Sequence, residues 1–291
     1  MSTTWTSDSF AKINLGLNVL HRNENGYHDI ETGFCFLEWR DTIRMTASEK
    51  PELVIEGNDE IPSDSSNLIM KAYYLLREFY GVKGSYRFKV IKRIPAGAGL
   101  GGGSSNAAMA LKMLRKAEKL DISDEELLDI GAQLGADIPL FIKGKTAIGT
   151  GTGTELKPAQ IQPDRWIVTV YPNFESSTPL AYANCTPNNE RLYSIEKILT
   201  DIPVDEWEYE LVNDLEQGVF QLHPTVGNFR DQMKEFGAEY AAMSGSGSSV
   251  FGLFEQDFVA LSAYKNFTDL GYQANLTKPL FQPDFGVYIL E

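Results

Sequence analysis

Hydrophobic and polar residues alternate strictly near the start of the chain, over residues 9–20. A period of two residues is typical of a β-strand with one core face and one polar face. The Asn25-Gly26 pair predicts a hairpin turn after this strand, and residues 32–45 and 53–56 are expected to continue the sheet. The apolar positions of the first strand are Ala11, Ile13, Leu15, Leu17 and Val19, and the polar positions are Lys12, Asn14, Gly16 and Asn18.

Helical spacing of apolar residues follows in three places, each with a residue suited to cap a helix. The first stripe is Leu68, Ala72, Leu75 and Phe79, capped by Ser65 or Ser66 and ended by Gly81; the second is Ala107, Leu111 and Leu114, capped by Ser104 or Ser105; the third begins at a capping box of Ser123 and Glu126 and ends at Gly135. Residues 86–94 alternate as a strand that Pro95 ends. Because Pro139 should prevent the third helix from resuming, residues 135–137 are expected to be a turn that enters the next strand.

The second half of the chain shows a different order of elements. Residues 149–163 are rich in Gly, Thr, Pro and Gln, which favours a linker or exposed loop. After them we expect a strand at 166–171, helices up to 236, strands at 239–243 and 249–254, a helix at 258–270 and a strand at 274–280. This is the order of a ferredoxin-like domain with extra helices in its first crossover. The chain is therefore predicted to be an α+β protein with two domains, 1–160 and 161–291, and ligands commonly bind between domains.

Composition narrows the kind of partner. The 291 residues are 43% hydrophobic and 23% charged, an ordinary globular composition. The formal charge of −14 repels nucleic acid and anionic membranes, so neither is expected as a partner. No run approaches the roughly 18 apolar residues of a membrane span, and residues 1–10 do not read as a secretion signal, which predicts a cytoplasmic protein. Cys35 and Cys185 are far apart in the chain and are expected to be small core residues.

The densest glycine segment, residues 97–103 with the sequence GAGLGGG, lies between a predicted strand and a predicted helix. A mobile loop would also explain these glycines. However, glycine lacks a Cβ and reaches positive φ, so consecutive backbone amides can converge on a phosphate at the N-terminus of the helix. An acidic chain that binds a phosphate needs such local donors.

Three look-alike motifs fail, and one further turn stays open. The G-x-G-x-x-G spacing within residues 97–102 follows Pro95 and lies too far into the chain for an N-terminal dinucleotide fold. Residues 144–146 imitate the end of a Walker A loop without its first glycine, and residues 284–286 read DFG without the H-R-D motif of protein kinases. A second glycine-rich turn, MSGSGSS at residues 243–249, is either a plain hairpin loop or a place where the backbone approaches a ligand.

Four segments in chain order resemble the GHMP kinases, a family of ATP-dependent small-molecule kinases. They are a strand with a functional lysine at Lys12, P-x-x-x-G-L-G-G-G-S-S at residues 95–105, G-A-D-x-P at 135–139 and S-G-x-G at 244–247. AKINLGL at residues 11–17, GYH at 26–28 and SNL at 66–68 resemble the branch that acts on a diphosphocytidyl-linked methylerythritol. The resemblance implies a ribosomal-protein-S5-like N-terminal domain, a ferredoxin-like C-terminal domain and an active site in the cleft between them.

The resemblance also implies a reaction, transfer of the γ-phosphoryl group of ATP to the 2-hydroxyl of 4-diphosphocytidyl-2-C-methyl-D-erythritol, in the non-mevalonate route to isoprenoid precursors. Asp137 would be the catalytic base, and Lys12 would stabilise its charge and the charge that develops during transfer. Mg²⁺ is implied together with ATP, and no protein ligand is indicated beyond the hydroxyl of Ser104 or Ser105. The enzyme would be a monomer or a homodimer.

The other implied contacts fall into an ATP group and a substrate group. The ATP-binding residues are Asn67, Pro95, Gly97, Gly99, Leu100, Gly101, Gly102, Gly103, Ser104 and Ser105. The substrate-binding residues are Asn14, Tyr27, His28, Asp137, Tyr182, Ser244, Gly245 and Gly247. Among them His28 is expected to hydrogen-bond the cytosine, while Tyr27 and Tyr182 stack on it.

Two other functions stay open from the sequence. Another GHMP kinase, acting on homoserine, mevalonate or a sugar, would give no reason for the Gly26-Tyr27-His28 segment. A catalytically inactive nucleotide-binding regulator is disfavoured because both Lys12 and Asp137 are present.

Overall fold

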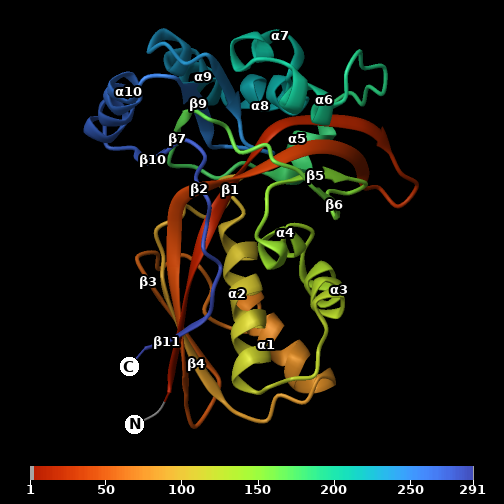
Figure 1. The fold of residues 1–291 in the computed structure, drawn as a ribbon, viewed down its shortest axis with the longest axis vertical. Coiled ribbons are helices and arrows are strands. Elements are labelled where there is room, and N and C mark those ends of the chain that lie inside the picture. The colour runs from red at the N-terminus through yellow and green to blue at the C-terminus, as the bar shows by residue number, and fades with distance from the viewer. Residues whose placement is uncertain (1–2, 291) are drawn as a thin grey trace.

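The two longest strands, β1 (Thr4–Arg22) and β2 (His28–Ala47), are antiparallel. In Figure 1 they run from the bottom of the molecule up to the group of helices at its top. The computed structural model describes residues 3–290. A turn that contains Asn25 and Gly26 joins the two strands, which confirms the predicted hairpin. Apolar residues of both strands share one buried cluster with residues of the second half, such as Ile13 with Phe251. The long hairpin therefore connects the two halves through a common core.

The first sheet has the strand order β11-β1-β2-β4-β3, and a hairpin of β5 and β6 pairs with β2. Neighbouring strands are antiparallel except β3 and β4, which are parallel. Helices α1 to α4 lie on one face of this sheet (Figure 1). The bounds are β3 (Glu52–Glu56), β4 (Tyr86–Ile91), β5 (Ala147–Thr150), β6 (Glu155–Pro158), β11 (Tyr288–Leu290), α1 (Leu68–Phe79), α2 (Gly102–Ala117), α3 (Asp124–Leu134) and α4 (Ile138–Lys143).

The second sheet has the antiparallel order β10-β7-β9-β8, with α9 and α10 packed on it. This order confirms the predicted ferredoxin-like half, and several short helices occupy its first crossover. The bounds are β7 (Trp166–Tyr171), β8 (Tyr240–Met243), β9 (Val250–Phe254), β10 (Gln273–Thr277), α5 (Thr178–Ala183), α6 (Ile195–Asp201), the 3₁₀ helix η1 (Val204–Glu206), α7 (Trp207–Glu210), α8 (Glu216–Leu222), α9 (Pro224–Glu235) and α10 (Asp257–Asp269).

The polar face of β1 is as buried as its core face. Lys12 and Asn14 are only 5% and 3% exposed. Segments from far along the chain cover them: the backbone N–H of Lys12 donates to the carbonyl oxygen of Leu100 (3.0 Å), and that of Asn14 donates to Ser244 Oγ (3.3 Å). Burying a charged side chain is costly unless it is paired, so this face is built around specific contacts.

Two of the three serine caps predicted in the first half were wrong, whereas Ser123 caps α3 as predicted by accepting a hydrogen bond from the N–H of Glu126 (3.1 Å). Helix α1 begins after Asn67, whose side chain accepts a hydrogen bond from the N–H of Ile69 (3.0 Å). Helix α2 begins at Gly102 without a side-chain cap, because Gly101 at the N-cap has a φ of 68° in the left-handed region. Ser104 and Ser105 therefore lie inside the first turn of α2, and the glycine segment itself leads the chain into the helix.

The turn at residues 135–137 does not enter a strand as predicted, because α4 follows it directly. Pro139 is the second residue of this short helix. In the first turn of a helix a backbone N–H has no intrahelical partner, so proline costs nothing there. Asp137 takes the N-cap position without making a capping bond, which leaves its carboxylate for other contacts.

The predicted loop at residues 149–163 was partly wrong. It contains the end of β5 and the whole of β6, which form an antiparallel hairpin at the edge of β2. Cys35 is buried, as predicted, whereas Cys185 is partly exposed and borders a cavity. Within residues 3–290 the structure has no helix that is long and apolar enough to cross a membrane.

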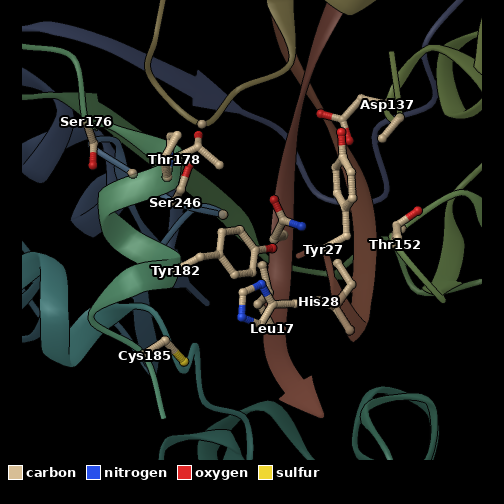
Figure 2. Close-up of a pocket in the computed structure, with 18 of the residues that line it drawn as sticks. Leu17, Tyr27, His28, Asp137, Thr152, Ser176, Thr178, Tyr182, Cys185 and Ser246 are labelled. Carbon is tan, nitrogen blue, oxygen red and sulfur yellow. Dashed lines mark hydrogen bonds between the residues drawn. The ribbon is translucent and has the colours of Figure 1, made fainter. Parts of the chain in front are cut away.

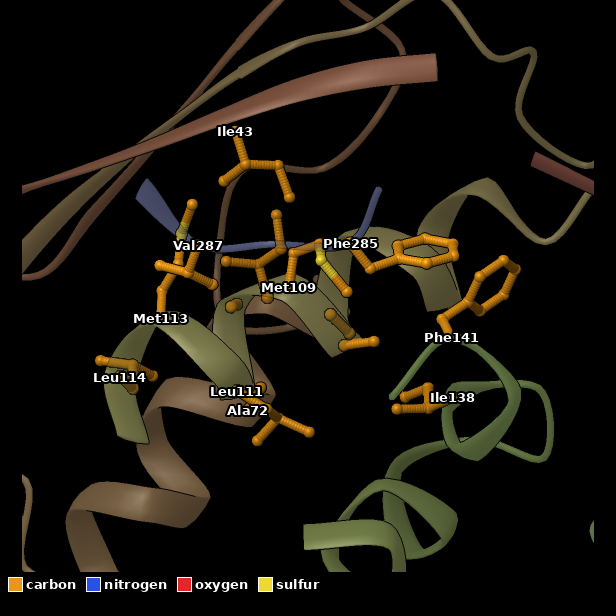
Figure 3. Packing of buried hydrophobic residues seen from close by; sticks show 14 of the residues in the cluster. Ile43, Ala72, Met109, Leu111, Met113, Leu114, Ile138, Phe141, Phe285 and Val287 are labelled. Carbon is orange, nitrogen blue, oxygen red and sulfur yellow. The ribbon is translucent and has the colours of Figure 1, made fainter. Parts of the chain in front are cut away.

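The C-terminal segment returns to the first sheet. Strand β11 pairs with the start of β1, and Phe285 and Val287 are buried in the core between the sheet and its helices. Figure 3 shows both side chains beside Met109 and Met113 of α2. The core of the first half thus contains residues from both ends of the chain.

Candidate active site

Two cavities share the glycine loop, residues 97–103, as a common wall. The larger cavity has a volume of about 1000 Å³ and the smaller about 550 Å³, sizes that suit small-molecule ligands. Both are lined by Gly97, Gly99, Gly101 and Ser104. The larger cavity also reaches Lys12, Asp137, His28 and the turn at 245–247, while the smaller one reaches Asn67 and Lys92. Two ligands bound in these cavities would meet at the loop.

The shape of the loop depends on glycine at particular positions. Gly97, Gly99 and Gly101 have φ values of 58°, 76° and 68°, which L side chains rarely adopt. A Cβ on Gly99 would lie 2.2 Å from the carbonyl oxygen of Ser244, so the turn at 243–249 touches the loop directly. The first N–H groups of α2 have no partner within the helix, and together with the loop they offer an anion site.

Lys12 and Asp137 meet at the larger cavity. Lys12 Nζ lies 3.5 Å from Asp137 Oδ2 and donates a 2.7 Å hydrogen bond to Asn14 Oδ1. The same ammonium group lies 5.5 Å from the centre of the Phe34 ring. The lysine side chain is 6% exposed and the aspartate side chain 31% exposed, so the buried cation faces a carboxylate that a ligand can reach. The sequence prediction brought these three residues together, and the geometry agrees with it.

The hairpin between β1 and β2 supplies the rings of Tyr27 and His28 to the larger cavity, where His28 lies beside Tyr182 (Figure 2). His28 stacks on Tyr182, with ring centres 4.9 Å apart and planes at 23°. Burial, followed by the charge of Arg22, lowers the pKa of His28, so its neutral ring offers one donor and one acceptor. Burial also raises the pKa of Tyr182 to about 12. Tyr27 is 67% exposed, so its ring is free to pack on a ligand.

The glycine-rich turn at 243–249 is both the β8–β9 connection and a wall of the larger cavity. Gly245, Ser246 and Gly247 line that cavity, and Ser246 Oγ lies 2.8 Å from Thr178 Oγ1 of α5. Ser244 does not line it, contrary to the substrate contact predicted for this residue. Its buried hydroxyl donates to the carbonyl oxygen of Gly99 (2.9 Å) and so links the two glycine segments.

A buried polar network lies behind the start of α2. Lys92 Nζ donates to Asp41 Oδ2 (2.6 Å), and Asn106 donates to the same oxygen (2.9 Å) and to Ser9 Oγ (2.8 Å). Burial lowers the pKa of Lys92, an effect that the neighbouring Asp41 opposes. Ser9 in turn donates to Ser105 Oγ (2.9 Å). This network fixes the first turn of α2 against β1.

The remaining predicted nucleotide residues differ in what they can offer. Asn67, Pro95 and Leu100 border the smaller cavity, but Asn67 already caps α1 and the Leu100 side chain is buried. Ser104 lines both cavities. Ser105 lines neither, because its side chain is buried against Ser9, so the contact predicted for its hydroxyl does not agree with the geometry.

The donors for a magnesium ion are sparse on the protein side. Within residues 3–290 no group of three or more His, Cys, Asp or Glu side chains could hold a metal ion. Mg²⁺ in phosphoryl-transfer sites commonly binds one or two protein groups and the phosphates of the substrate. Ser104 Oγ would lie 3.9 Å from a Cβ built on Gly135, two residues before Asp137. The Ser104 hydroxyl beside the loop therefore fits a Mg²⁺ ion that arrives with the phosphates of the nucleotide.

Comparison with known proteins decides the family. Residues 67–145 match the model of the GHMP kinases N terminal domain, and residues 190–273 match that of the GHMP kinases C terminal domain. The 4-diphosphocytidyl-2-C-methyl-D-erythritol kinase of Parabacteroides distasonis is 42% identical over 84% of this chain and 90% of its own length. The kinase of the same name from Pelodictyon phaeoclathratiforme is 39% identical over 94% of this chain and 96% of its own length.

The chain belongs to the 4-diphosphocytidyl-2-C-methyl-D-erythritol kinase family. A crystal structure of a 4-(cytidine 5'-diphospho)-2C-methyl-D-erythritol kinase matches it with a TM-score of 0.78 and 32% identity, over 94% of this chain and 99% of the other. A homoserine kinase from Cytophaga hutchinsonii matches with a TM-score of 0.70 but 14% identity, which indicates a shared fold alone. The chain is accordingly a kinase with the two-domain GHMP fold, as the sequence predicted.

Sequence reasoning missed several polar residues that build this kinase site. Asp41, Asn106 and Asn213 are buried and hydrogen-bonded beside the glycine segments. Asp41 and Asn213 stand in no recognisable motif, whereas Asn106 directly follows the glycine-loop motif at residues 95–105. That position beside the loop was the one available signal.

Proposed function

We propose that this kinase transfers the γ-phosphoryl group of ATP to the 2-hydroxyl of 4-diphosphocytidyl-2-C-methyl-D-erythritol. One observation carries the proposal: the glycine loop separates two cavities, and the Lys12–Asp137 pair lies beside it in the larger one. A nucleotide in the smaller cavity would place its terminal phosphate at the loop. The hydroxyl of an acceptor in the larger cavity would reach that phosphate next to Asp137.

Asp137 is the general base in this proposal. Its carboxylate accepts the proton of the 2-hydroxyl while the oxygen forms a bond to the γ-phosphorus, and the bond to the leaving oxygen of ADP breaks. Such transfer depends mainly on positioning and on neutralising charge. Lys12, whose Nζ lies 3.5 Å from Asp137 Oδ2, stabilises the negative charge of Asp137 and of the transferred group. Asn14 holds the lysine in place by accepting its 2.7 Å hydrogen bond.

The glycine loop and the start of α2 bind the ATP phosphates. The left-handed glycines leave the backbone open to phosphate oxygens, and the helix N-terminus adds partial positive charge. Ser104, which lines both cavities, would hold a Mg²⁺ ion together with the phosphates, and the ion would neutralise charge on the transferred group. The adenosine then extends toward Asn67 and Pro95 in the smaller cavity.

The cytidyl end of the acceptor binds at the β1–β2 hairpin. The neutral ring of His28 presents one donor and one acceptor to the base edge, and the exposed Tyr27 ring and the Tyr182 ring provide aromatic faces. Gly245 and Gly247 approach the middle of the acceptor by backbone alone. We place the division between the two domains near residue 160. A single copy supplies every residue named here, so a monomer or a homodimer would carry complete sites.

An assay of ADP release tests the proposed substrate directly. The purified chain is given ATP, Mg²⁺ and one acceptor at a time: the cytidyl substrate, mevalonate or homoserine. We expect turnover with the cytidyl substrate and with neither of the other two acceptors. The Asp137→Asn variant should keep only a small residual activity with the cytidyl substrate. Turnover with mevalonate or homoserine but not with the cytidyl substrate would overturn the proposal.

A further inference from the structure

A four-residue segment of the second half, residues 213–216, ties together the parts that form the larger cavity. The sequence there is Asn-Asp-Leu-Glu. Asp214 Oδ2 accepts a hydrogen bond from the backbone N–H of Val19 in β1 (2.7 Å). Glu216 Oε1 accepts from the N–H of Met243 at the end of β8 (2.7 Å). The segment is therefore hydrogen-bonded through Asp214 to the strand that carries Lys12 and through Glu216 to the start of the glycine-rich turn.

Asn213 makes the central contacts of this segment. Its amide Nδ2 donates to the carbonyl oxygens of Met243 (2.9 Å) and Gly245 (2.8 Å), which lie on either side of Ser244. Its Oδ1 accepts from the N–H of Leu215 (3.0 Å). The residue is 4% exposed and does not line either cavity. Its hydrogen-bonding groups are thus occupied inside the protein, and it is placed to act on the turn rather than on a ligand.

The turn at residues 243–249 is itself hydrogen-bonded to the glycine loop, so the position of one affects the position of the other. Ser244, held between the two carbonyl groups that Asn213 binds, donates its hydroxyl proton to the carbonyl oxygen of Gly99 (2.9 Å). The backbone N–H of Asn14 donates to the same hydroxyl (3.3 Å). A shift at Ser244 would therefore move the loop and the strand that carries Lys12 at the same time.

The segment is also anchored to β1 through the backbone. The N–H of Leu17 donates to Val212 O (2.9 Å), and the N–H of Asp214 donates to Leu17 O (2.9 Å). The residues on both sides of Asn213 are thus hydrogen-bonded to β1, the strand that carries Lys12. The donation of Asn213 to two carbonyls is what aligns the turn with that strand, because an amide NH₂ group offers two donors in one plane.

We infer that Asn213 is a positioning residue for phosphoryl transfer, which sets the glycine-rich turn, and through Ser244 the glycine loop, relative to Lys12. The inference rests on the proposed function, because it concerns the geometry of the same site. Small misplacements of reacting groups are costly in such reactions. Asn213 acts without touching either substrate.

Two substitutions isolate the bonds to the turn. Asn213→Asp keeps the shape and the acceptor for the Leu215 N–H, but it turns an oxygen toward two carbonyl oxygens. Asn213→Ser retains one hydroxyl donor and serves if the buried carboxylate prevents folding. The matched control is Thr277→Val: Thr277 is also fully buried and bridges the two halves by accepting from the N–H of Glu38 (2.8 Å), but it lies away from the turn.

The experiment combines kinetics with amide hydrogen exchange on the full chain. In folded Asn213 variants we expect kcat to fall at least about tenfold and KM for the cytidyl substrate to rise at least about fivefold. Amides of residues 243–249 should exchange at least about tenfold faster. Thr277→Val should leave kcat, KM and the exchange of residues 243–249 unchanged, even if it lowers stability.

The outcomes separate the inference from the proposed function. If folded Asn213 variants keep the kcat, KM and exchange rates of the parent chain, Asn213 has no positioning role. A merely structural role would lower the folded fraction and leave KM unchanged, which would also overturn the inference. If the parent chain does not turn over the cytidyl substrate, the proposed function fails, while exchange in residues 243–249 still reports whether Asn213 sets the turn.

Discussion

Lys12 Nζ lies 3.5 Å from Asp137 Oδ2, although Lys12 belongs to β1, near the start of the chain, and Asp137 is the N-cap of the short helix α4, far along it. This distance is longer than a hydrogen bond, and the ammonium group of Lys12 donates its shortest hydrogen bond to Asn14 instead. The Asp137 carboxylate therefore keeps acceptor positions that face the cavity. A base that must accept a substrate proton needs that freedom.

Replacing Asp137 by Asn should remove the base and keep the fold. We expect kcat to fall by about 10² to 10⁴, the usual range for a general base, with little change in the melting temperature. Steady-state kinetics and thermal unfolding measure both. Asp129→Asn, on an exposed position of α3, is the control and should behave like the parent chain. An unchanged kcat in the Asp137 variant would remove this residue from the mechanism.

Alanine at two positions of the glycine segment should have opposite outcomes. Gly101 has a φ of 68°, and a Cβ there would lie 2.8 Å from Phe141 Cζ. The left-handed conformation alone costs about 1 to 2 kcal/mol for a residue with a Cβ, so Gly101→Ala should weaken ADP binding at least about tenfold. A Cβ on Gly103 meets only Leu68, at 3.9 Å, so Gly103→Ala should bind ADP normally. Calorimetric titration that found equal affinities would contradict the assigned role of the loop.

Loss of the His28 ring should affect one substrate only. We expect His28→Ala to raise KM for the cytidyl substrate at least about tenfold, since unpaired polar groups of the base cost about 1 to 3 kcal/mol each. KM for ATP should stay within about a factor of two. Because His28 stacks on Tyr182, Tyr182→Ala should show the same selectivity in a milder form, and Tyr182→Phe should not. A raised KM for ATP instead would assign the hairpin to the nucleotide.

The pH dependence of stability should report Glu216. Burial is the main cause that raises the pKa of its carboxyl group to about 7. The hydrogen bond from the Met243 N–H and the charge of Arg230 favour the ionised form and oppose this rise, whereas the charge of Asp231 adds to it. Above its ordinary pKa of 4.5 the unfolded chain is ionised while the folded chain still binds the proton. The contribution of Glu216 to stability is therefore full below pH 4.5 and lost as the pH rises through about 7.

Glu216→Gln removes this titration and keeps an acceptor for the Met243 N–H. A difference of about 2.5 pKa units corresponds to about 3 kcal/mol, so the variant should gain about that much stability relative to the parent chain between pH 4.5 and pH 8. Urea unfolding of both proteins at several pH values measures the difference. Parallel pH profiles would show that Glu216 is ionised in the folded protein.

Local patterns predicted much of this structure because they act over a few residues. Alternation gave the hairpin of β1 and β2, and the order of elements gave the ferredoxin-like half. The start of α2 was missed because a left-handed glycine replaced the side-chain cap that the serines suggested. The role of Pro139 was missed because proline both ends helices and begins them.

The site was predictable only where residue type and motif coincided. Lys12, Asp137 and the left-handed glycines stand in recognisable segments. Asn213 does not, because its partners Met243 and Gly245 lie some thirty positions later and are backbone groups of no particular residue type. Ser244 was assigned to a ligand for the opposite reason: its motif was visible, but its partner Gly99 was not.

The return of the chain to its first sheet has a consequence for biosynthesis. Phe285 and Val287 fill the core against α2, and β11 completes the edge beside β1. While the chain is being synthesised, β1 emerges early but its edge partner emerges only after the second half has been made. The first half therefore cannot reach its final packing as an early, separate unit, in contrast to the usual N-terminal-first folding of domains on the ribosome. Until residues 281–290 are added, Phe10 and Phe141 lack the Phe285 ring that packs on both of them in the finished core.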